Sequence, residues 1–103
     1  MKAYLITSAS QNVEVVDVSG IGDIVDLIGH NTIEADPIDE DGTRLYFDEE
    51  CFIRGDAVSG RFQLDSLIPV AGLAVVAGSD KDAEDICDVK LDIDELLGRV
   101  KFL

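Results

Sequence analysis

Short apolar runs separated by polar turn residues divide this chain into strand-like and helix-like segments. The first two runs, Lys2–Thr7 and Asn12–Val18, are rich in strand-forming residues and flank the polar break Ser8–Asn12, which predicts an opening β-hairpin. In the second run Val15 and Val16 are neighbours, so the alternation of apolar and polar positions is broken. This irregularity predicts either a β-bulge or a strand covered on both faces.

A second hairpin is predicted from Asn31–Asp36 and Thr43–Asp48, which flank the turn Pro37–Gly42. That turn ends in Asp-Gly, where the glycine accepts a positive φ and the aspartate side chain can bond its own backbone. The carboxylates of Asp48–Glu50 predict another tight turn, after which the chain is expected to return as a strand over Cys51–Arg54. The simplest outcome is a meander.

One amphipathic helix is predicted over Ile21–Ile28, where apolar residues recur at the spacing of one helical face. Ser19 or Gly20 can cap its start. Asp23 places negative charge near the positive end of the helix dipole, and Gly29 can end the helix in the left-handed conformation.

A last helix is predicted to begin at Asp92 and to run over Ile93–Val100. Asp92, followed three residues later by Glu95, is an Asp variant of the capping box. Arg99 and Lys101 complement the negative C-terminal end of this helix. Its apolar face is expected to consist of Ile93, Leu96, Leu97 and Val100.

The most apolar stretch of the chain is Leu67–Gly78, which is too uniform for a strand with one solvated face. Within it, Leu73–Ala77 is predicted to be a central strand buried on both faces. Arg61–Leu64 predicts a further extended segment. Gly55–Gly60 and Ser79–Asp85 are predicted to be loops.

Together these elements predict one α+β domain over residues 1–103, with a mainly antiparallel sheet of five to seven strands and two short helices. A small β-barrel with helices at its ends is the alternative. The predicted core consists of Leu5, Val15, Ile24, Ile28, Leu45, Phe47, Leu73, Val75, Ile93 and Leu97.

Charge narrows the range of functions more than any motif does. The chain has 22 acidic and 8 basic residues, a net charge of −14, with 47% hydrophobic residues that predict a folded core rather than a disordered acidic tail. Direct binding of DNA or RNA is not expected, because it depends on Lys and Arg neutralising phosphates. A basic partner is the natural complement, and the alternative is that the charge serves only solubility.

The densest negative charge falls on the second hairpin, which has one base, Arg44. Its eight carboxylates are our candidate binding residues: Glu34, Asp36, Asp39, Glu40, Asp41, Asp48, Glu49 and Glu50. On a strand, alternate residues share a face, so carboxylates spaced by two can be presented side by side.

Two cysteines, Cys51 and Cys87, lie far apart and have neither disulfide-framework nor zinc-site spacing. The N-terminus lacks the apolar length of a signal peptide, and the uncharged run Leu67–Ser79 is too short to span a bilayer. These features predict a cytoplasmic protein that does not enter a membrane.

No recognisable catalytic motif and no cofactor signature is present, so enzymatic activity is not expected but stays open. An EF-hand alignment of Pro37–Asp48 puts Pro37 at the first ligand position and Asp48 where glutamate is needed. Loose binding of a divalent cation by the turn is the remaining metal hypothesis.

The Gly20-Ile-Gly22 sequence lacks the third glycine of a dinucleotide site. His30 could act as a base only if the fold brought it to a nucleophile such as Cys51.

The order of these segments resembles the domain-of-unknown-function family numbered 3846, over roughly residues 12–79. The segments that carry the likeness are the valine-rich strand and first helix, Thr32–Ala35, the acidic turn, Leu45–Glu50 and Val70–Gly78. Members are small proteins of bacteria, their phages and mobile elements, with no established activity. The resemblance therefore implies a setting rather than a reaction, and it assigns no functional residue.

The leading hypothesis is a non-enzymatic binding protein of a phage or mobile element, whose carboxylate-rich hairpin engages a basic protein surface; imitation of the phosphates of nucleic acid is one way in which it could do so. The alternatives are a small-ligand, metal-binding or enzymatic domain, which would need a pocket with convergent polar groups. A homodimer joined through an edge strand such as Phe52–Arg54 is a third.

Overall fold

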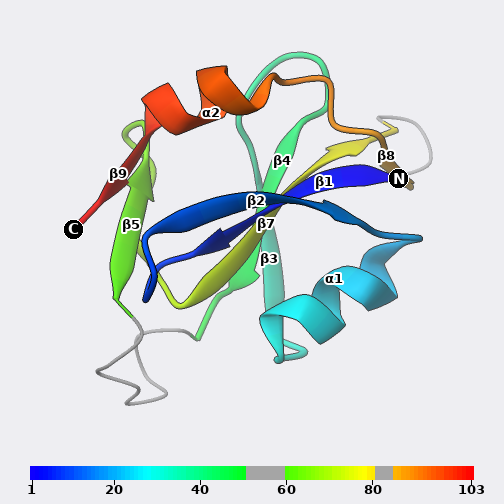
Figure 1. Cartoon of the computed structure of the whole chain (residues 1–103). Coiled ribbons are helices and arrows are strands. Elements are labelled where there is room, and N and C mark those ends of the chain that lie inside the picture. Colours follow the sequence, from blue (N-terminus) through cyan, green and yellow to red (C-terminus); the bar gives the residue numbers. More distant parts are fainter. Residues whose placement is uncertain (51–59, 81–84) are drawn as a thin grey trace.

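The computed structural model describes residues 1–50, 60–80 and 85–103 (Figure 1). A six-stranded antiparallel sheet has the spatial order β2-β1-β7-β4-β3, with β8 paired to the end of β7. Its strands are β1 Lys2–Thr7, β2 Asn12–Asp17, β3 Ile33–Pro37, β4 Arg44–Asp48, β7 Leu73–Ser79 and β8 Ile86–Cys87. A smaller sheet, ordered β6-β5-β9, contains β5 Arg61–Leu64, β6 Val70–Ala71 and β9 Val100–Phe102. The helices are α1 Ile21–Ile28 and α2 Ile93–Arg99.

The α+β class, with a mainly antiparallel sheet and two short helices, is confirmed. Among the described residues, the two edge strands of the large sheet, β2 and β3, do not pair with each other, so the sheet does not close into the alternative barrel. No helix of the described ranges is long and apolar enough to cross a membrane.

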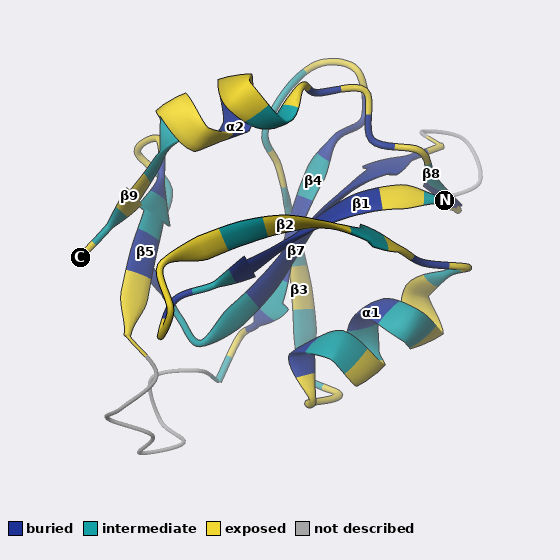
Figure 2. Cartoon of the chain, in the orientation of Figure 1, coloured by how far each residue is buried: buried dark blue, intermediate teal, exposed yellow. Residues whose placement is uncertain are grey.

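The core lies on both faces of the large sheet, because alternate side chains of β1, β4 and β7 point to opposite sides. One cluster, on the α1 side, includes Leu5, Ile24, Ile28, Tyr46 and Val75. The other, on the side of the small sheet and α2, includes Tyr4, Leu45, Phe62, Val76 and Leu96. Figure 2 shows burial running along β1 and β7 at the centre of the fold.

Strand β7 is the predicted central strand, and the prediction is confirmed. Residues Ala74–Ala77 are fully buried because β1 and β4 pair with its two edges while the two core clusters cover its faces. The strand is longer than expected, since Ser79 is its buried last residue rather than the first residue of a loop.

The opening hairpin is confirmed, but both interpretations of Val15 and Val16 are wrong. Strands β1 and β2 pair one to one without a bulge, and β2 is an edge strand with Val15 55% exposed. The valine pair therefore reflects strand propensity at an edge and not burial on two faces.

The predicted meander is also wrong, because β4 pairs with β3 on one side and with β7 on the other. The strand expected over Cys51–Arg54, the loop expected over residues 55–59 and the edge at Phe52–Arg54 lie outside the described residues, as do positions 81–84 of the predicted Ser79–Asp85 loop.

Helix α1 has the predicted bounds and ends at Gly29, whose φ of 86° is left-handed. Helix α2 begins after Asp92, but no side-chain hydrogen bond caps it, so the predicted capping box is wrong. It ends one residue early, because Val100 enters strand β9. Leu97 is 46% exposed and does not join the core, whereas its neighbour Leu96 is fully buried.

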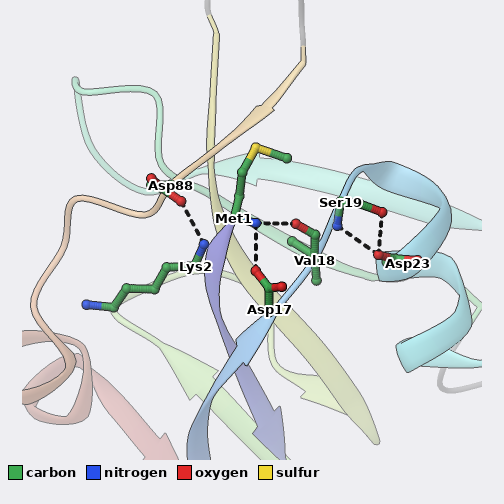
Figure 3. A network of polar contacts seen from close by, with 7 residues as sticks. All are labelled: Met1, Lys2, Asp17, Val18, Ser19, Asp23 and Asp88. Atoms are coloured by element: carbon green, nitrogen blue, oxygen red, sulfur yellow. Dashed lines mark hydrogen bonds and ion pairs between the residues drawn. The ribbon is translucent and has the colours of Figure 1, made fainter.

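The N-terminus is tied into the sheet by a polar network (Figure 3). The Met1 ammonium donates to Asp17 Oδ1 at 2.7 Å and to the Val18 carbonyl oxygen, and the hydrogen bond to Asp17 raises the pKa of the ammonium above its usual 8.0. The Lys2 N–H donates to Asp88 Oδ1 at 2.7 Å. These contacts join the start of β1 to the end of β2 and to the segment after β8.

Candidate functional site

The acidic hairpin predicted from the sequence is strands β3 and β4 with their connecting turn. Its register pairs Ile33 with Asp48, Ala35 with Tyr46 and Pro37 with Arg44. Side chains of these six residues share the face toward α1, whereas Glu34 and Asp36 lie on the opposite face with Leu45 and Phe47. The hairpin's one base therefore points away from the carboxylates of β3.

At the end of the hairpin near residue 48, the carboxylates divide into a buried and an exposed set. Asp48 is 3% exposed, and its carboxylate accepts one hydrogen bond from the Thr32 hydroxyl and another from the Glu50 N–H at 3.1 Å. Asp48 therefore holds the turn after β4. Asp48 is therefore not among the exposed members of the candidate set.

Glu34 and Glu49 are exposed neighbours at this end. A hydrogen bond between the two carboxyl groups raises the pKa of Glu49 above its usual 4.5, and the charges of Glu34, Glu50 and Asp48 act in the same direction. A neighbouring negative charge disfavours the ionised form of a carboxyl group. The crowding is local evidence that the hairpin concentrates negative potential.

At the other end, Asp39 organises the turn. Its Oδ1 accepts the N–H of Asp41 at 2.8 Å and that of Thr43 at 3.1 Å. Burial raises the pKa of Asp39, but the hydrogen bonds from Thr43 and Asp41 outweigh it and leave the pKa below the usual value. Gly42 has the predicted positive φ, 93°, and its carbonyl oxygen accepts the Ser79 hydroxyl at 2.7 Å.

Arg99 anchors the same turn from helix α2. Its guanidinium forms an ion pair with Asp65 and donates to the carbonyl oxygen of Ile38 at 2.7 Å. Sequence reasoning gave Arg99 only a role at the helix terminus and missed this bridge. No local signal could have revealed it, because Ile38, Asp65 and Arg99 are distant in the sequence.

The eight candidate residues thus do not form one uniform face. Glu34, Glu40, Asp41 and Glu49 are exposed; Asp36, Asp39 and Glu50 are half-buried; and Asp48 is buried. The exposed members lie at the two ends of the hairpin, Glu34 and Glu49 at one and Glu40 and Asp41 at the other.

Beside the turn is an open hollow of about 480 Å³. Its charged lining is Glu40, Asp41, Asp80, Asp88 and Lys90. Within the described ranges, however, no group of three or more His, Cys, Asp or Glu side chains is arranged to hold a metal ion. The loose cation hypothesis therefore gains no geometric support from this part of the chain.

A second hollow, of about 360 Å³, lies on the α1 side of the hairpin. It is lined by Ile21, Ile33, Ala35, Arg44, Tyr46 and Ile86.

The hypothesis that His30 acts as a base on Cys51 is not tested, because Cys51 lies outside the described residues. His30 itself is exposed beyond helix α1.

Comparisons with known proteins add no relative. No family model, curated protein or solved structure matches the chain. The resemblance to the family numbered 3846 therefore stays a prediction. The proposed function therefore rests on the charges and geometry of the hairpin.

Proposed function

We propose that this chain is a non-enzymatic binding protein whose carboxylate-rich hairpin engages a basic protein surface. The phage or mobile-element setting is part of the proposal and rests on the sequence resemblance alone. A partner that handles nucleic acid is the best complement, because its surface already carries a groove matched to phosphate charges.

The observation that supports the proposal most is the separation of charge across β3 and β4. Glu34 and Asp36 lie on one face and Arg44 lies on the other, so the hairpin does not neutralise its own acidic face. Glu49 adds negative charge beside Glu34, and the hydrogen bond between the two carboxyl groups raises the pKa of Glu49. Long-range attraction from such a surface speeds association with a basic partner and falls as salt rises.

The test separates charge at this site from net charge. One variant carries Glu34→Gln, Glu40→Gln, Asp41→Asn and Glu49→Gln, which leaves the hydrogen-bonded Asp39 and Asp48 intact. The matched control carries four neutralisations at exposed positions elsewhere: Glu14→Gln, Asp26→Asn, Asp92→Asn and Asp94→Asn. Both variants lose the same number of negative charges.

Each purified protein is used at low salt to capture partners from a lysate of the source organism, followed by a salt step and competition with duplex DNA. We expect the wild type and the control to retain a basic protein that the hairpin variant loses, and DNA to displace it. If the hairpin variant and the control lose capture equally, or neither does, the hairpin is not the binding face.

A further inference from the structure

The outer edge of β3 carries backbone groups that no described residue pairs. The Glu49 N–H donates to the Thr32 carbonyl oxygen, and the Ile38 N–H donates to the Thr43 carbonyl oxygen. Because hydrogen-bonded pairs alternate along an antiparallel hairpin, the backbone groups of Glu34 and Asp36 point toward β4. Those of Ile33, Ala35 and Pro37 point outward. Among the described strands, β3 is the last one on this side of the sheet.

The outward groups form a small and specific set. The Ile33 N–H is already bonded to the Asn31 carbonyl oxygen at 2.9 Å, and Pro37 has no N–H. Ala35 alone on this strand offers both an outward N–H and an outward carbonyl. An added antiparallel strand would therefore be registered on Ala35, because a pair of residues exchanging two hydrogen bonds needs both groups on each partner.

The two faces beside this edge have different chemistry. Side chains of an added strand lie on the same face as the residues that they oppose. A residue opposite Ala35 points toward the hollow of about 360 Å³, whose lining is mainly apolar: Ile21, Ile33, Ala35, Tyr46 and Ile86, with Arg44. The residues on either side of it point to the opposite face, next to Glu34 and Asp36.

We propose that β3 accepts an extended segment of the basic partner as an additional antiparallel strand. Three consecutive residues of that segment are basic, apolar and basic. This inference rests on the proposed function and specifies its binding mode. The apolar side chain enters the hollow, and the two basic side chains oppose Glu34 and Asp36. Arg44 repels a basic residue from the hollow side, so a segment shifted by one residue is rejected.

The other free edge, β2, fits such a segment less well. The N–H of Val18 donates to the Met1 carbonyl oxygen, so Val13, Val15 and Asp17 direct their backbone groups outward. Its acidic residues, Glu14 and Asp17, lie on opposite faces, and Asp17 is bound by the N-terminal ammonium. Strand β2 is therefore the matched control edge.

The probe is a capped seven-residue synthetic peptide with Lys-Val-Lys at its centre and uncharged, strand-forming flanks. A peptide of the same composition with the two lysines adjacent is the charge control. Binding is measured by calorimetry, and the amide signal of Ala35 is followed by NMR hydrogen exchange. We expect the Lys-Val-Lys peptide to bind at least tenfold more tightly than the control and to protect the Ala35 N–H.

Ala35→Pro removes the outward N–H without touching the β3–β4 hydrogen bonds, as Pro37 already does two residues later. We expect it to weaken peptide binding about five- to tenfold, the loss of one hydrogen bond. Val15→Pro makes the same change on β2 and should leave binding unchanged.

If Ala35→Pro does not fold, the same question is asked of the peptide. Methylating the backbone nitrogen of the central valine removes its bond to Ala35, whereas methylating that of either lysine alters an N–H that points away. We expect only the former to weaken binding.

The outcomes separate the two proposals. Loss of binding in the four-amide hairpin variant, with Ala35→Pro and the central methylation harmless, overturns strand addition and leaves the acidic face standing. Sensitivity to Ala35→Pro with no effect of the four amides, which include Glu34→Gln, supports strand addition at this edge but contradicts both the pairing of a basic side chain with Glu34 and the charge proposal. Absence of any peptide binding overturns strand addition, while the capture experiment decides the proposed function independently.

Discussion

Gly42, at the end of the acidic turn, is the residue whose replacement should damage the hairpin most. Its φ is 93°, a conformation that L side chains rarely adopt, and a Cβ atom there would lie 2.5 Å from the carbonyl oxygen of Ser79. That oxygen belongs to buried strand β7 and cannot move freely. The Ser79 hydroxyl also donates to the Gly42 carbonyl oxygen, so displacing the turn would break a buried hydrogen bond.

The cost of Gly42→Ala can be built from these parts. The left-handed backbone costs roughly 1–2 kcal/mol for a residue with a Cβ atom. Relieving the contact with Ser79 would strain or break the buried hydrogen bond, at roughly 1–3 kcal/mol. The sum is about 2–5 kcal/mol, a large part of the roughly 5–15 kcal/mol that stabilises a typical domain.

The assay is urea unfolding of the wild type, Gly42→Ala and the control Gly98→Ala, followed by circular dichroism. Gly98 lies inside helix α2 and has no positive φ, and a Cβ atom added there would have no atom within 4 Å apart from its chain neighbours and the backbone of its own helix. There the same change should stabilise by up to about 1 kcal/mol through helix propensity. If Gly42→Ala loses less than about 1 kcal/mol, or behaves like the control, the turn is not held by the conformation and contact described above.

Four further outcomes are expected. Leu96→Ala should cost about 2–5 kcal/mol in urea unfolding, and Leu97→Ala well under that, because Leu96 is fully buried and Leu97 is 46% exposed; equal losses would contradict this packing of α2. Glu49→Gln should raise Tm at pH 7 and have no effect well below pH 4.5, because a raised carboxyl pKa means that ionisation above it costs stability; a lower Tm at pH 7 would refute the crowding of Glu34 and Glu49. The hydrogen bond from Arg99 lowers the pKa of Asp65 from its usual 3.8, so Asp65→Asn should destabilise at neutral pH, with the difference from wild type vanishing as pH falls through the depressed pKa; a difference that persists in strong acid would point to another cause. Sodium chloride should raise Tm by screening the net charge of −14, and a Tm that falls with salt would contradict self-repulsion.

Local patterning determined most of the secondary structure of this protein. The Asp-Gly turn, the apolar spacing of Ile21–Ile28 and the uniform run around Leu73–Ala77 each depend on a few adjacent residues, and each yielded the expected element. The local sequence also determined the sign of the charge on the hairpin, because residues 34–50 contain eight acidic residues and one basic residue.

Tertiary structure alone decided which elements are neighbours and which side chains are covered. Val15 and Leu97 have the residue types and local spacing of core positions, yet they are exposed, because no element of the described ranges packs over them. The insertion of β7 between β1 and β4 replaced the expected meander, since long-range pairing is not encoded in any local pattern.

The candidate site shows the same division. The sequence named its carboxylates, but only the register of β3 and β4 separated Glu34 and Asp36 from Arg44 and identified Ala35 as the residue with two outward backbone groups. Likewise, only the fold showed that Asp48 is buried and that Thr32 and Glu50 donate to it. A sequence specifies which charges exist, whereas the face of the sheet that each charge occupies depends on the pairing register. A shift of the register by one residue would move every side chain of the strand to the other face.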